Sequence, residues 1–458
     1  MKSRLIALLA ILAMVVAACG GDDSGASTTE APDTTQPATE TTEPATDTTE
    51  PATDTTEVMD GVACDEPITV GVIGDFTGPL AIYGAHVARG MPIGFAYATG
   101  GEPQTGEEQT YTLDDCELRV LTRDDQSDPE IAATAARELI EVEGAEVLIG
   151  SISSGVTATL QGIAAENDVI LIVPAAAATD ITAKDFNENT FRTSRSNYQD
   201  GMAICDQFVN GNGYKTFVQI APDYSFGYGG AQAYEDACTF YGGEFLADPV
   251  FAPADTTDFT TYLEPFAGTD ADAFLVTWAG GGFVPLLQAA IDLGVIDDDT
   301  VLGSPFVDNV VMPSFFGNAV GTTSVILYHY TLPDNEVNDY LVTQAEAMGA
   351  VPDLFDPDAM DAAIFLVEAL RATGGSAAPG DLKAVMEGMT FEGPKGTVEI
   401  RAEDHVAIQD IYVVTLTGFG DAGPEYEYVA TVRPEPPCLL EGDFIDRCGD
   451  LPVGSLGG

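Results

Sequence analysis

The amino-acid sequence predicts an α/β fold made of two doubly wound parallel-sheet lobes. From residue 61 onward, short β-branched runs alternate with amphipathic, alanine-rich stretches, in the order strand then helix, as in βαβ units. About 400 residues follow that point, which is more than one hydrophobic core usually serves, so two lobes are expected. Right-handed crossovers then bury both faces of each sheet.

The predicted elements are short strands separated by helices. The strands are the β-branched runs at 68–73, 117–122, 146–149, 169–173, 217–220, 274–277 and 323–328. The helices between them include 129–143, 156–167, 227–241 and 283–293. Ligands in such folds bind beyond the carboxyl ends of the strands, so the segments after each strand are where we expect a site.

The first residues are typical of an export signal. Lys2 and Arg4 precede an apolar run over 5–18, which is shorter than the roughly 20 residues of a membrane-spanning helix. The run ends Val-Ala-Ala-Cys-Gly, which resembles the bacterial lipobox, the alternative being an ordinary secretory peptide with a chance cysteine. We therefore expect 1–18 to be a lipoprotein signal peptide. Cys19 is then lipidated and anchors the protein to the outer face of the cytoplasmic membrane.

Residues 19–60 form a predicted spacer behind that anchor. Residues 22–60 contain no aromatic residue and no Lys or Arg, and they repeat Thr-Thr-Glu-Pro-Ala-Thr-Asp almost verbatim. A segment with so little apolar surface cannot offset the entropy of ordering, so we expect it to be disordered. Clustered Thr and Pro also permit O-glycosylation.

The charge balance excludes some classes of partner. Acidic residues number 74 against 16 basic ones, for a formal net charge of −58. Such a surface repels nucleic acid and anionic lipid, so neither is expected to bind it. The simplest interpretation of the acidity is an adaptation for solubility or salt.

Six cysteines remain after Cys19, an even number that suggests disulfides in an exported protein. Cys64 and Cys116 each precede a predicted strand, and they can bridge if these strands are parallel neighbours. Cys205 and Cys238 fall in predicted helices of one region, and Cys438 and Cys448 can close a short loop in the tail. We predict these three pairs. Neither a Cys-x-x-Cys nor a His-x-x-x-His spacing occurs, so no metal site is expected.

The segments that follow the strands carry a family resemblance, spread in order over residues 66 to about 433. They read Gly-Asp-Phe-Thr-Gly-Pro-Leu-Ala-Ile-Tyr-Gly (74–84), Ile-Gly-Ser-Ile-Ser-Ser-Gly (149–155), Pro-Ala-Ala-Ala-Ala-Thr-Asp-Ile-Thr (174–182), Phe-Arg-Thr (191–193), Asp-Tyr-Ser-Phe-Gly (223–227), Thr-Thr-Asp-Phe (256–259) and Gly-Pro-Lys-Gly-Thr-Val-Glu-Ile-Arg-Ala-Glu-Asp (393–404). In this set the chain resembles the type I periplasmic solute-binding proteins of ABC transporters, in particular the branched-chain amino-acid (Leu/Ile/Val-binding-like) family.

The resemblance implies an architecture and partners. The chain would cross between its lobes near Thr193, Thr331 and His405, forming a three-strand hinge. The implied division is lobe 1 at 61–192 and 331–404, lobe 2 at 193–330 and 405–435, and a C-terminal tail at 436–458. The expected partners are a small-molecule ligand and the membrane subunits of an ABC importer, with no cofactor and a monomeric protein.

Two serines are candidates for holding an anionic group of the ligand. Ser153 and Ser154 lie at the start of the helix after the third predicted strand, where free N–H groups and the helix dipole favour an anion. A serine hydroxyl adds a donor for a ligand carboxylate or carbonyl. The alternative, that one serine only caps the helix, is weaker for Ser154 than for Ser153. The resemblance singles out Ser154 as the carboxylate anchor.

Ala175 and Ala177 are expected to line the opposite wall with main-chain groups, but the sequence departs from the family here. Amino-acid binders usually carry Thr where Ala177 stands. They also place an acid within the segment that reads Trp-Ala-Gly-Gly-Gly-Phe (278–283), to pair with the ligand ammonium, and no acid occurs between Asp272 and Asp292. A buried ammonium without a carboxylate partner is costly. The ligand classes therefore include amides, urea-like solutes and aromatic acids beside amino acids.

Aromatic residues are candidates for covering the ligand. Tyr83 and Phe226 come from opposite lobes, with Tyr224 and Trp278 as further candidates and Asp308 as a weaker polar one. Aromatic walls give large contact area with few rotors to freeze. Core packing is the alternative for any one of them.

Two other functional classes are alternatives, an enzyme and a sensor protein. A hydrolase would need a nucleophile elbow, but the glycine required two places before the central serine of 151–155 is itself a serine. Nothing places a histidine beside that serine, so an enzyme is not expected. A sensor protein of the same fold is the other alternative.

Overall fold

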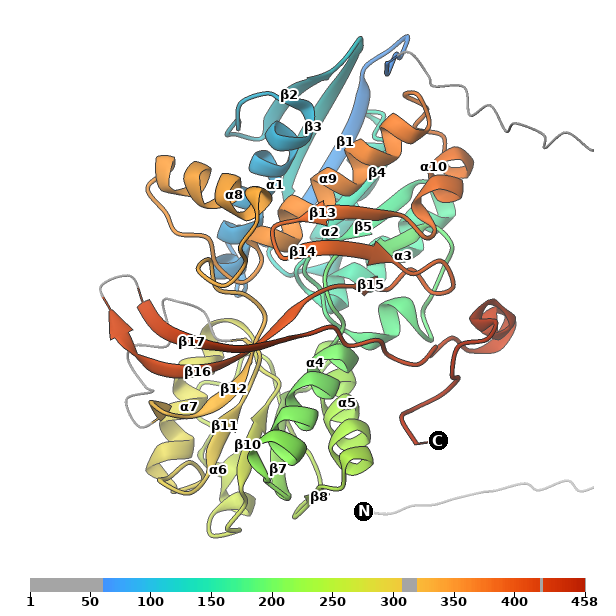
Figure 1. Ribbon diagram of the computed structural model, residues 1–458. Helices are drawn as coiled ribbons and strands as arrows, with labels where there is room; N and C mark the ends of the chain where they lie inside the picture. The colour runs from blue at the N-terminus through green and yellow to red at the C-terminus, as the bar shows by residue number, and fades with distance from the viewer. Residues whose placement is uncertain (1–60, 307–318, 421–422, 458) are drawn as a thin grey trace, which may run out of the picture. The chain divides into compact units, whose positions relative to one another are not determined.

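The computed structural model describes residues 61–306, 319–420 and 423–457, which contain two lobes (Figure 1). Val58–Gly458 form one compact unit. The signal peptide, Cys19 and the spacer lie outside the described residues. Lobe 1 contains the first sheet of the chain, and lobe 2 contains the second.

Lobe 1 is built on a six-stranded sheet. Its strands are β1 (Ile68–Gly74), β2 (Glu108–Leu113), β3 (Cys116–Asp124), β4 (Val147–Gly150), β5 (Ile170–Val173) and β6 (Thr190–Arg192). They lie in the order β2-β3-β1-β4-β5-β6, all parallel except for β2. The helices are α1 (Ala81–Thr99), α2 (Pro129–Glu141), α3 (Ser154–Asn167), α8 (Glu336–Ala347), α9 (Asp356–Ala372) and α10 (Pro379–Met386). α1 and α9 pack on one face of the sheet, and α2 and α3 pack on the other.

Lobe 2 repeats this plan with a smaller parallel sheet. Its strands are β7 (Thr216–Pro222), β8 (Glu244–Phe245), β9 (Val250–Ala252), β10 (Ala273–Val276) and β11 (Val301–Gly303). The order is β11-β10-β7-β8, and β9 also pairs with β7. The helices are α4 (Asn197–Asp206), α5 (Ser225–Tyr241), α6 (Thr260–Leu263) and α7 (Phe283–Asp292). α4 and α5 cover one face of this sheet, and α6 and α7 cover the other.

Two antiparallel sheets complete the lobes. β12 (Thr323–Ile326), β16 (Ile411–Gly420) and β17 (Gly423–Val432) form one that packs in lobe 2. β13 (Thr390–Gly393), β14 (Gly396–Ile400) and β15 (Ala407–Ile408) form one that packs in lobe 1. Shorter helical turns are η1 (Thr179–Thr182), η2 (Gln207–Asn212), η3 (Glu264–Phe266), η4 (Gly280–Gly282) and η7 (Gly442–Cys448).

The predicted α/β fold with two parallel-sheet lobes is present, but the order of strand then helix does not hold throughout. β2 and β3 form an antiparallel hairpin, joined at Asp114, which has φ 54°. The predicted strand at 323–328 pairs antiparallel with β16 instead of joining the parallel sheet. The sequence of β2 alternates exposed and buried residues, as expected of an edge strand that is solvated on one face.

The chain passes between the lobes at three places that separate the sheets. It leaves β6 for α4 through 193–196, returns from β12 to α8 through 327–335, and leaves β15 for β16 through 409–410. Each lobe is therefore assembled from segments that are distant in sequence. The predicted lobe boundaries remain predictions, and β15 already pairs with lobe 1 beyond the predicted crossing at His405.

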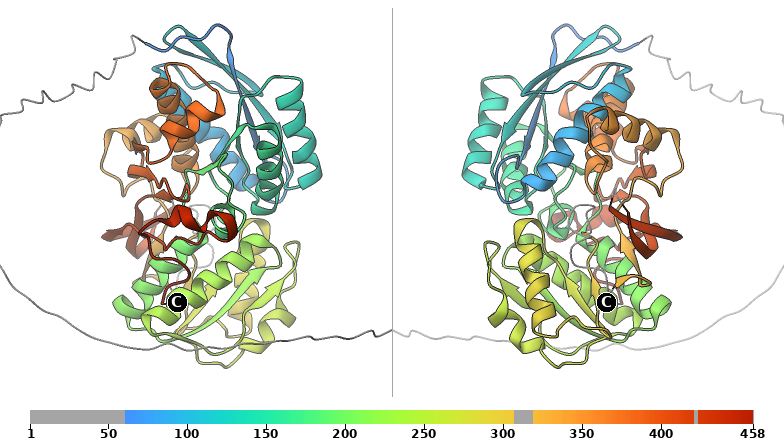
Figure 2. Two further views of the ribbon diagram at one scale, coloured as in Figure 1. Left: turned by 90° about the vertical axis from the view of Figure 1, so that its right-hand side faces the viewer. Right: turned by 90° about the vertical axis from the view of Figure 1, so that its left-hand side faces the viewer.

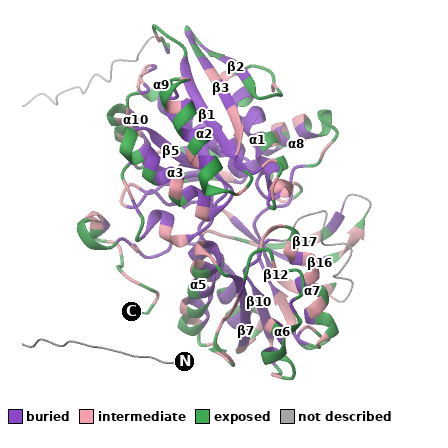
Figure 3. Cartoon of the chain, turned by 180° about the vertical axis from the view of Figure 1, so that it is seen from behind, coloured by how far each residue is buried: buried purple, intermediate pink, exposed green. Residues whose placement is uncertain are grey.

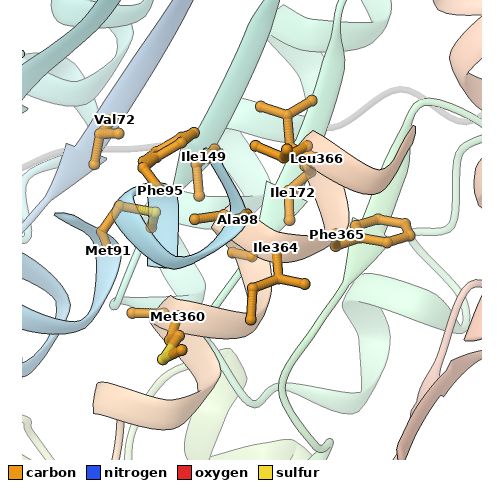
Figure 4. Packing of buried hydrophobic residues seen from close by; sticks show 14 of the residues in the cluster. Val72, Met91, Phe95, Ala98, Ile149, Ile172, Met360, Ile364, Phe365 and Leu366 are labelled. Carbon is orange, nitrogen blue, oxygen red and sulfur yellow. The ribbon is translucent and has the colours of Figure 1, made fainter. Parts of the chain in front are cut away.

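The core of lobe 1 depends on a close approach of α1 and α9 (Figure 4). Met91 and Phe95 of α1 and Met360 and Ile364 of α9 are buried in one cluster with the sheet. A Cβ atom at Gly90 would lie 2.2 Å from the Asp356 carbonyl oxygen, and one at Gly94 would lie 2.6 Å from that of Met360. These two glycines therefore allow α9 to lie in direct contact with α1. Figure 3 shows that the central strands of both parallel sheets are buried and that the outer helix faces are exposed.

The three predicted disulfides are present in the structure. Cys64–Cys116 links the segment before β1 to the first residue of β3, and these strands are parallel neighbours as the prediction required. Cys205–Cys238 joins α4 to α5 in lobe 2, and Cys438–Cys448 closes a loop in the tail. Each lobe thus has a covalent link of its own.

The C-terminal tail contacts both lobes (Figure 2). Arg447, within the tail loop, binds the Glu387 carboxylate at 2.7 Å and the Ala402 carbonyl at 2.9 Å, both on lobe 1. Further along, the Leu456 N–H donates to the Tyr198 hydroxyl of α4, on lobe 2, at 2.8 Å. The tail therefore runs from one lobe to the other.

Candidate functional site

A small pocket lies between the two lobes, where the segments after several strands meet. Its lobe 1 side is formed after β1, β4 and β5 and at the start of α9, and its lobe 2 side after β7, β10 and β11. The lining residues are Leu80, Tyr83, Ile152, Ser154, Ala175, Ala177 and Phe355 from lobe 1, and Tyr224, Phe226, Ala279 and Phe306 from lobe 2. Six of the predicted binding residues are thus brought together: Tyr83, Ser154, Ala175, Ala177, Tyr224 and Phe226.

Ser154 is the first residue of α3 and is buried in the pocket wall. Its Oγ accepts a hydrogen bond from the Ala178 N–H at 3.1 Å, so the hydroxyl proton is still available to a ligand acceptor. No side-chain cap hydrogen bond occurs at the start of α3. The capping alternative therefore has no geometric support for Ser154.

Ser153 is the N-cap residue of α3 in backbone conformation, and it is buried beside the pocket without belonging to its lining. Its carbonyl accepts a hydrogen bond from the Thr157 hydroxyl at 3.0 Å. The structure thus separates the two serines, with Ser154 facing the pocket.

The loop after β5 has its peptide groups held in one orientation. The Ala176 and Ala178 carbonyls accept hydrogen bonds from the Arg192 guanidinium at 2.5 and 2.7 Å, and the Ala177 carbonyl accepts from the Asn197 N–H at 2.7 Å. In a trans peptide the N–H points opposite to the carbonyl, so the Ala177 N–H is directed away from Arg192. This loop therefore presents N–H donors on the side opposite to the arginine.

Aromatic rings close the pocket from both lobes. Tyr83 lies 5.2 Å from Phe355, ring centroid to ring centroid, and its hydroxyl accepts a hydrogen bond from the Gly280 N–H of lobe 2 at 3.3 Å. On the other side, Phe226 packs edge-on against Phe306 at 5.5 Å. Burial raises the pKa of Tyr224, so this phenol stays neutral and acts as a donor or acceptor only.

The remaining predicted residues have other places. Trp278 is buried in the core of lobe 2, edge-on to Phe259 at 4.9 Å, and does not line the pocket. The next residue, Ala279, faces the pocket in its stead, because successive residues of extended chain point to opposite sides. Asp308 lies outside the described residues.

Five lining residues were not predicted: Leu80, Ile152, Ala279, Phe306 and Phe355. The first four follow strands, so the strand-end rule alone would have included them. Phe355 precedes α9 and carries no such signal in the sequence.

Acidic groups are missing from this lining. The segment where amino-acid binders carry an acid forms the turn η4, made only of glycine, and Gly280 has φ 75°. Among the lining residues described, none carries a charge. The pocket is therefore suited to an apolar or aromatic body with a polar group at the Ser154 side.

Other features of the described chain do not compete with this site. A larger space of about 1050 Å³ lies in lobe 2 between α7 and the β12–β16 pair, away from the loops that meet between the lobes, and none of the predicted binding residues lines it. The described residues hold no cluster of three or more potential metal ligands. They also include no helix with the length and apolarity needed to cross a membrane.

Comparison with known proteins identifies the family. Residues 67–423 match the model of the periplasmic binding protein family. The chain belongs to the periplasmic binding proteins. It is a solute-binding protein of the kind that serves ABC transporters, and proteins of this family bind substrates without being enzymes.

Individual relatives agree with this assignment. The chain is 26% identical over 356 residues to Leu/Ile/Val-binding protein homolog 6 of Brucella melitensis, covering 76% of this chain and 87% of the relative. An ABC-type branched-chain amino acid transporter structure from Rhodopseudomonas palustris is 30% identical with a TM-score of 0.67, over 80% of this chain and 96% of that one. A solute-binding protein from R. palustris in complex with benzoate is 26% identical with a TM-score of 0.69, over 81% and 98% of the two chains. These relatives confirm the fold and the solute-binding class.

Proposed function

We propose that this periplasmic binding protein captures a small carboxylate-bearing solute between its lobes and delivers it to the membrane subunits of an ABC importer. The observation that carries the proposal is the pocket, which combines hydrogen-bonding groups of lobe 1 with aromatic and apolar surface from both lobes. The Ser154 hydroxyl and the start of α3 are suited to an anionic oxygen. The three crossings between the lobes act as the hinge on which the pocket closes.

Within this class, the lining favours an aromatic or apolar acid over a standard amino acid. An ammonium group in the pocket would lack a carboxylate partner among the described lining residues, at a high cost in free energy. The relatives include both kinds of binder, one named for Leu, Ile and Val and one solved with benzoate. Amides and urea-like solutes fit the polar wall less well, because they lack the negative charge that the helix start favours.

A ligand screen tests this proposal. Thermal unfolding of the purified mature chain is measured with benzoates, branched-chain amino acids, their amides and urea, and hits are followed by calorimetric titration. An aromatic or aliphatic carboxylate should raise the unfolding midpoint and bind with a stoichiometry of one per chain. If only α-amino acids bind, the preferred ligand class is wrong, and if no small solute binds, the function is wrong.

We also propose that Cys19 is the lipidated N-terminus of the mature protein and that 20–60 hold the lobes away from the membrane. The support is the lipobox-like sequence and the composition of the spacer. A Cys19→Ala variant should leave the membrane fraction and lose the lipid on its N-terminal peptide in mass spectrometry. A variant that still partitions wholly with membranes would overturn the anchor.

A further inference from the structure

Two buried arginines lie behind the loop that forms the lobe 1 wall of the pocket. The side chains of Arg192 and Arg195 are both fully buried. Arg192 binds two loop carbonyls, and Nη1 of Arg195 lies 3.5 Å from a third, that of Ala175. Because Ala175 itself lines the pocket, the Arg195 guanidinium is separated from the pocket by one layer of chain.

Arg195 also contacts two aromatic rings of the lining. Its guanidinium carbon lies 4.8 Å from the ring centroid of Phe306 and 5.5 Å from that of Phe355. Both rings face the pocket, so the cation borders it from the lobe 1 loop to the lobe 2 cover. Among the described residues, Nη2 of this side chain has no hydrogen-bond partner. Buried guanidinium N–H groups normally have one.

The two buried arginines have few carboxylate partners of their own. Arg195 has one ion-pair partner among the described residues, Asp200, with Nε and Oδ1 3.3 Å apart but without hydrogen-bond geometry. Arg192 binds carbonyls only. Burial and the neighbouring Arg195 lower the pKa of Arg192 to about 9, which still leaves it charged near neutral pH. Asp404 also favours the charged form of Arg192 but is paired with Arg401, so among the described residues Asp200 is the carboxylate that the two arginines share.

We propose that Arg195 gives this pocket its selectivity for an anionic ligand, with Arg192 as the positioning residue that orients the peptide groups of the Ala175–Ala178 loop. The inference rests on the proposed solute-binding function and deepens it, because it assigns the ligand a net negative charge. A carboxylate in the pocket is attracted to the nearby Arg195 guanidinium, whereas a neutral amide of the same shape lacks the charge for this attraction. A zwitterionic amino acid brings the carboxylate together with an ammonium that has no acidic partner in the described lining.

The comparison of an acid with its amide tests the role of Arg195. Benzoate and benzamide have nearly the same shape and differ by one charge. Titration calorimetry on the wild type should give a clear preference for benzoate. Arg195→Met should lower benzoate affinity about tenfold or more while changing benzamide affinity little, and Arg195→Lys should keep most of the preference. Arg123→Met removes one positive charge from an exposed ion pair in lobe 1 and should leave the preference unchanged.

Asp200→Asn supplies a second, opposite test that does not depend on the stability of the Arg195 variants. Removing the carboxylate that competes for Arg195 should strengthen benzoate binding relative to benzamide. If Arg195 were only structural, Arg195→Met would weaken acid and amide alike and Asp200→Asn would leave their ratio unchanged, which overturns the inference. If another carboxylate from the screen binds better than benzoate, the same ratio is measured with that acid and its amide.

A failure of the inference about Arg195 can be told apart from a failure of the proposed function. A wild type that binds no solute in the screen refutes the function itself. A wild type that binds a solute but does not prefer the acid over its amide refutes the role of Arg195 alone.

Discussion

The two walls of the pocket differ in the kind of contact they offer. The lobe 1 wall combines the start of α3, the Ser154 hydroxyl and a loop whose carbonyls are held by a buried arginine. The lobe 2 wall offers mainly aromatic and apolar surface, from Tyr224, Phe226, Ala279 and Phe306. Lobe 1 also supplies contact area, from Leu80, Tyr83, Ile152 and Phe355, so the two walls differ mainly in their directional contacts. On the proposed function, lobe 1 orients the solute and both lobes exclude water from it.

The largest effects are expected from breaking either lobe's own covalent link. A Cys64→Ala/Cys116→Ala variant opens a loop of 52 residues in lobe 1, and Cys205→Ala/Cys238→Ala opens one of 33 in lobe 2. Each should lower the free energy of unfolding by roughly 4 kcal/mol, because loop-closure entropy depends only weakly on loop length. Chemical denaturation of both variants measures this. Losses that differ by several kcal/mol would show that the lobes are stabilised unequally.

The next largest effect is expected from removing the Ser154 hydroxyl, the proposed lobe 1 contact for the ligand carboxylate. Ser154→Ala deletes one hydrogen bond to a charged oxygen but leaves the helix N–H groups in place, so it should cost about 1.5 to 3 kcal/mol of binding free energy. That corresponds to a roughly tenfold to hundredfold loss of affinity in calorimetric titration. Ser153→Ala is the matched control, since Ser153 does not line the pocket. Lowered apo stability with unchanged affinity would restore the capping role and remove Ser154 from the site.

Weakening the aromatic surface that lobe 2 places over the pocket should lower the affinity less than Ser154→Ala does. It should act on the rate of dissociation of the solute. Phe226→Leu keeps an apolar side chain but loses the edge-on ring contact with Phe306, worth about 0.5 to 1.5 kcal/mol. Because the cover retains the bound solute, we expect a faster dissociation rate with little change in association. Stopped-flow measurement separates the two rates. A change confined to association would contradict the assignment of lobe 2 as the cover.

The last two predictions concern the dependence of folding stability on pH. Burial raises the pKa of Asp125, beside β3 in lobe 1, to about 6, although the Ser151 hydroxyl bonds to it at 2.6 Å. Its protonated form is therefore favoured by folding. This contribution to stability is complete below the unfolded pKa near 4 and is lost as pH rises through about 6, by about 3 kcal/mol. Thermal unfolding of Asp125→Asn should show a flatter pH dependence between pH 4 and 7 than the wild type.

Asp272 in lobe 2 serves as the comparison for Asp125, because its pKa is shifted in the opposite direction. Burial alone would raise its pKa, but hydrogen bonds from Lys215 and Thr216 lower it overall. Its stabilising contribution is present above the unfolded pKa and is lost as pH falls below about 4. Asp272→Asn should therefore alter the profile only at the acidic end. An equal effect of both variants near pH 6 would show that these carboxylates do not titrate separately.

The sequence was sufficient for the features that depend on local pattern. The β-branched runs located β1, β3, β4, β5, β7 and β10 but not the outer strands of the two sheets, and the segments after them supplied most of the pocket, because strand order places these ends together. The pairing of Cys64 with Cys116 followed from the adjacency of β1 and β3. Each of these features depends only on which residues lie at or next to the ends of a strand in the sequence.

Features that depend on long-range packing were not predictable in this way. Phe355 reaches the pocket because α9 packs on α1 where Gly90 and Gly94 permit it, and nothing near Phe355 indicates that contact. Trp278 was expected at the pocket on its size and position, but the alternation of extended chain turns it into the lobe 2 core. The buried charge of Arg195 is likewise visible only once the loop at 174–178 and the rings of Phe306 and Phe355 are placed around it.

The tail beyond residue 433 lies outside the part of the chain that matches the family, yet it is attached to both lobes. Its contacts at Arg447 and Leu456 lie on opposite sides of the pocket's hinge, and residues 448–455 connect them. That connection can extend to roughly 30 Å at most. The tail is therefore a tether of fixed length, so the lobes can separate widely only if the Leu456 end detaches from Tyr198 or the cystine loop detaches from lobe 1.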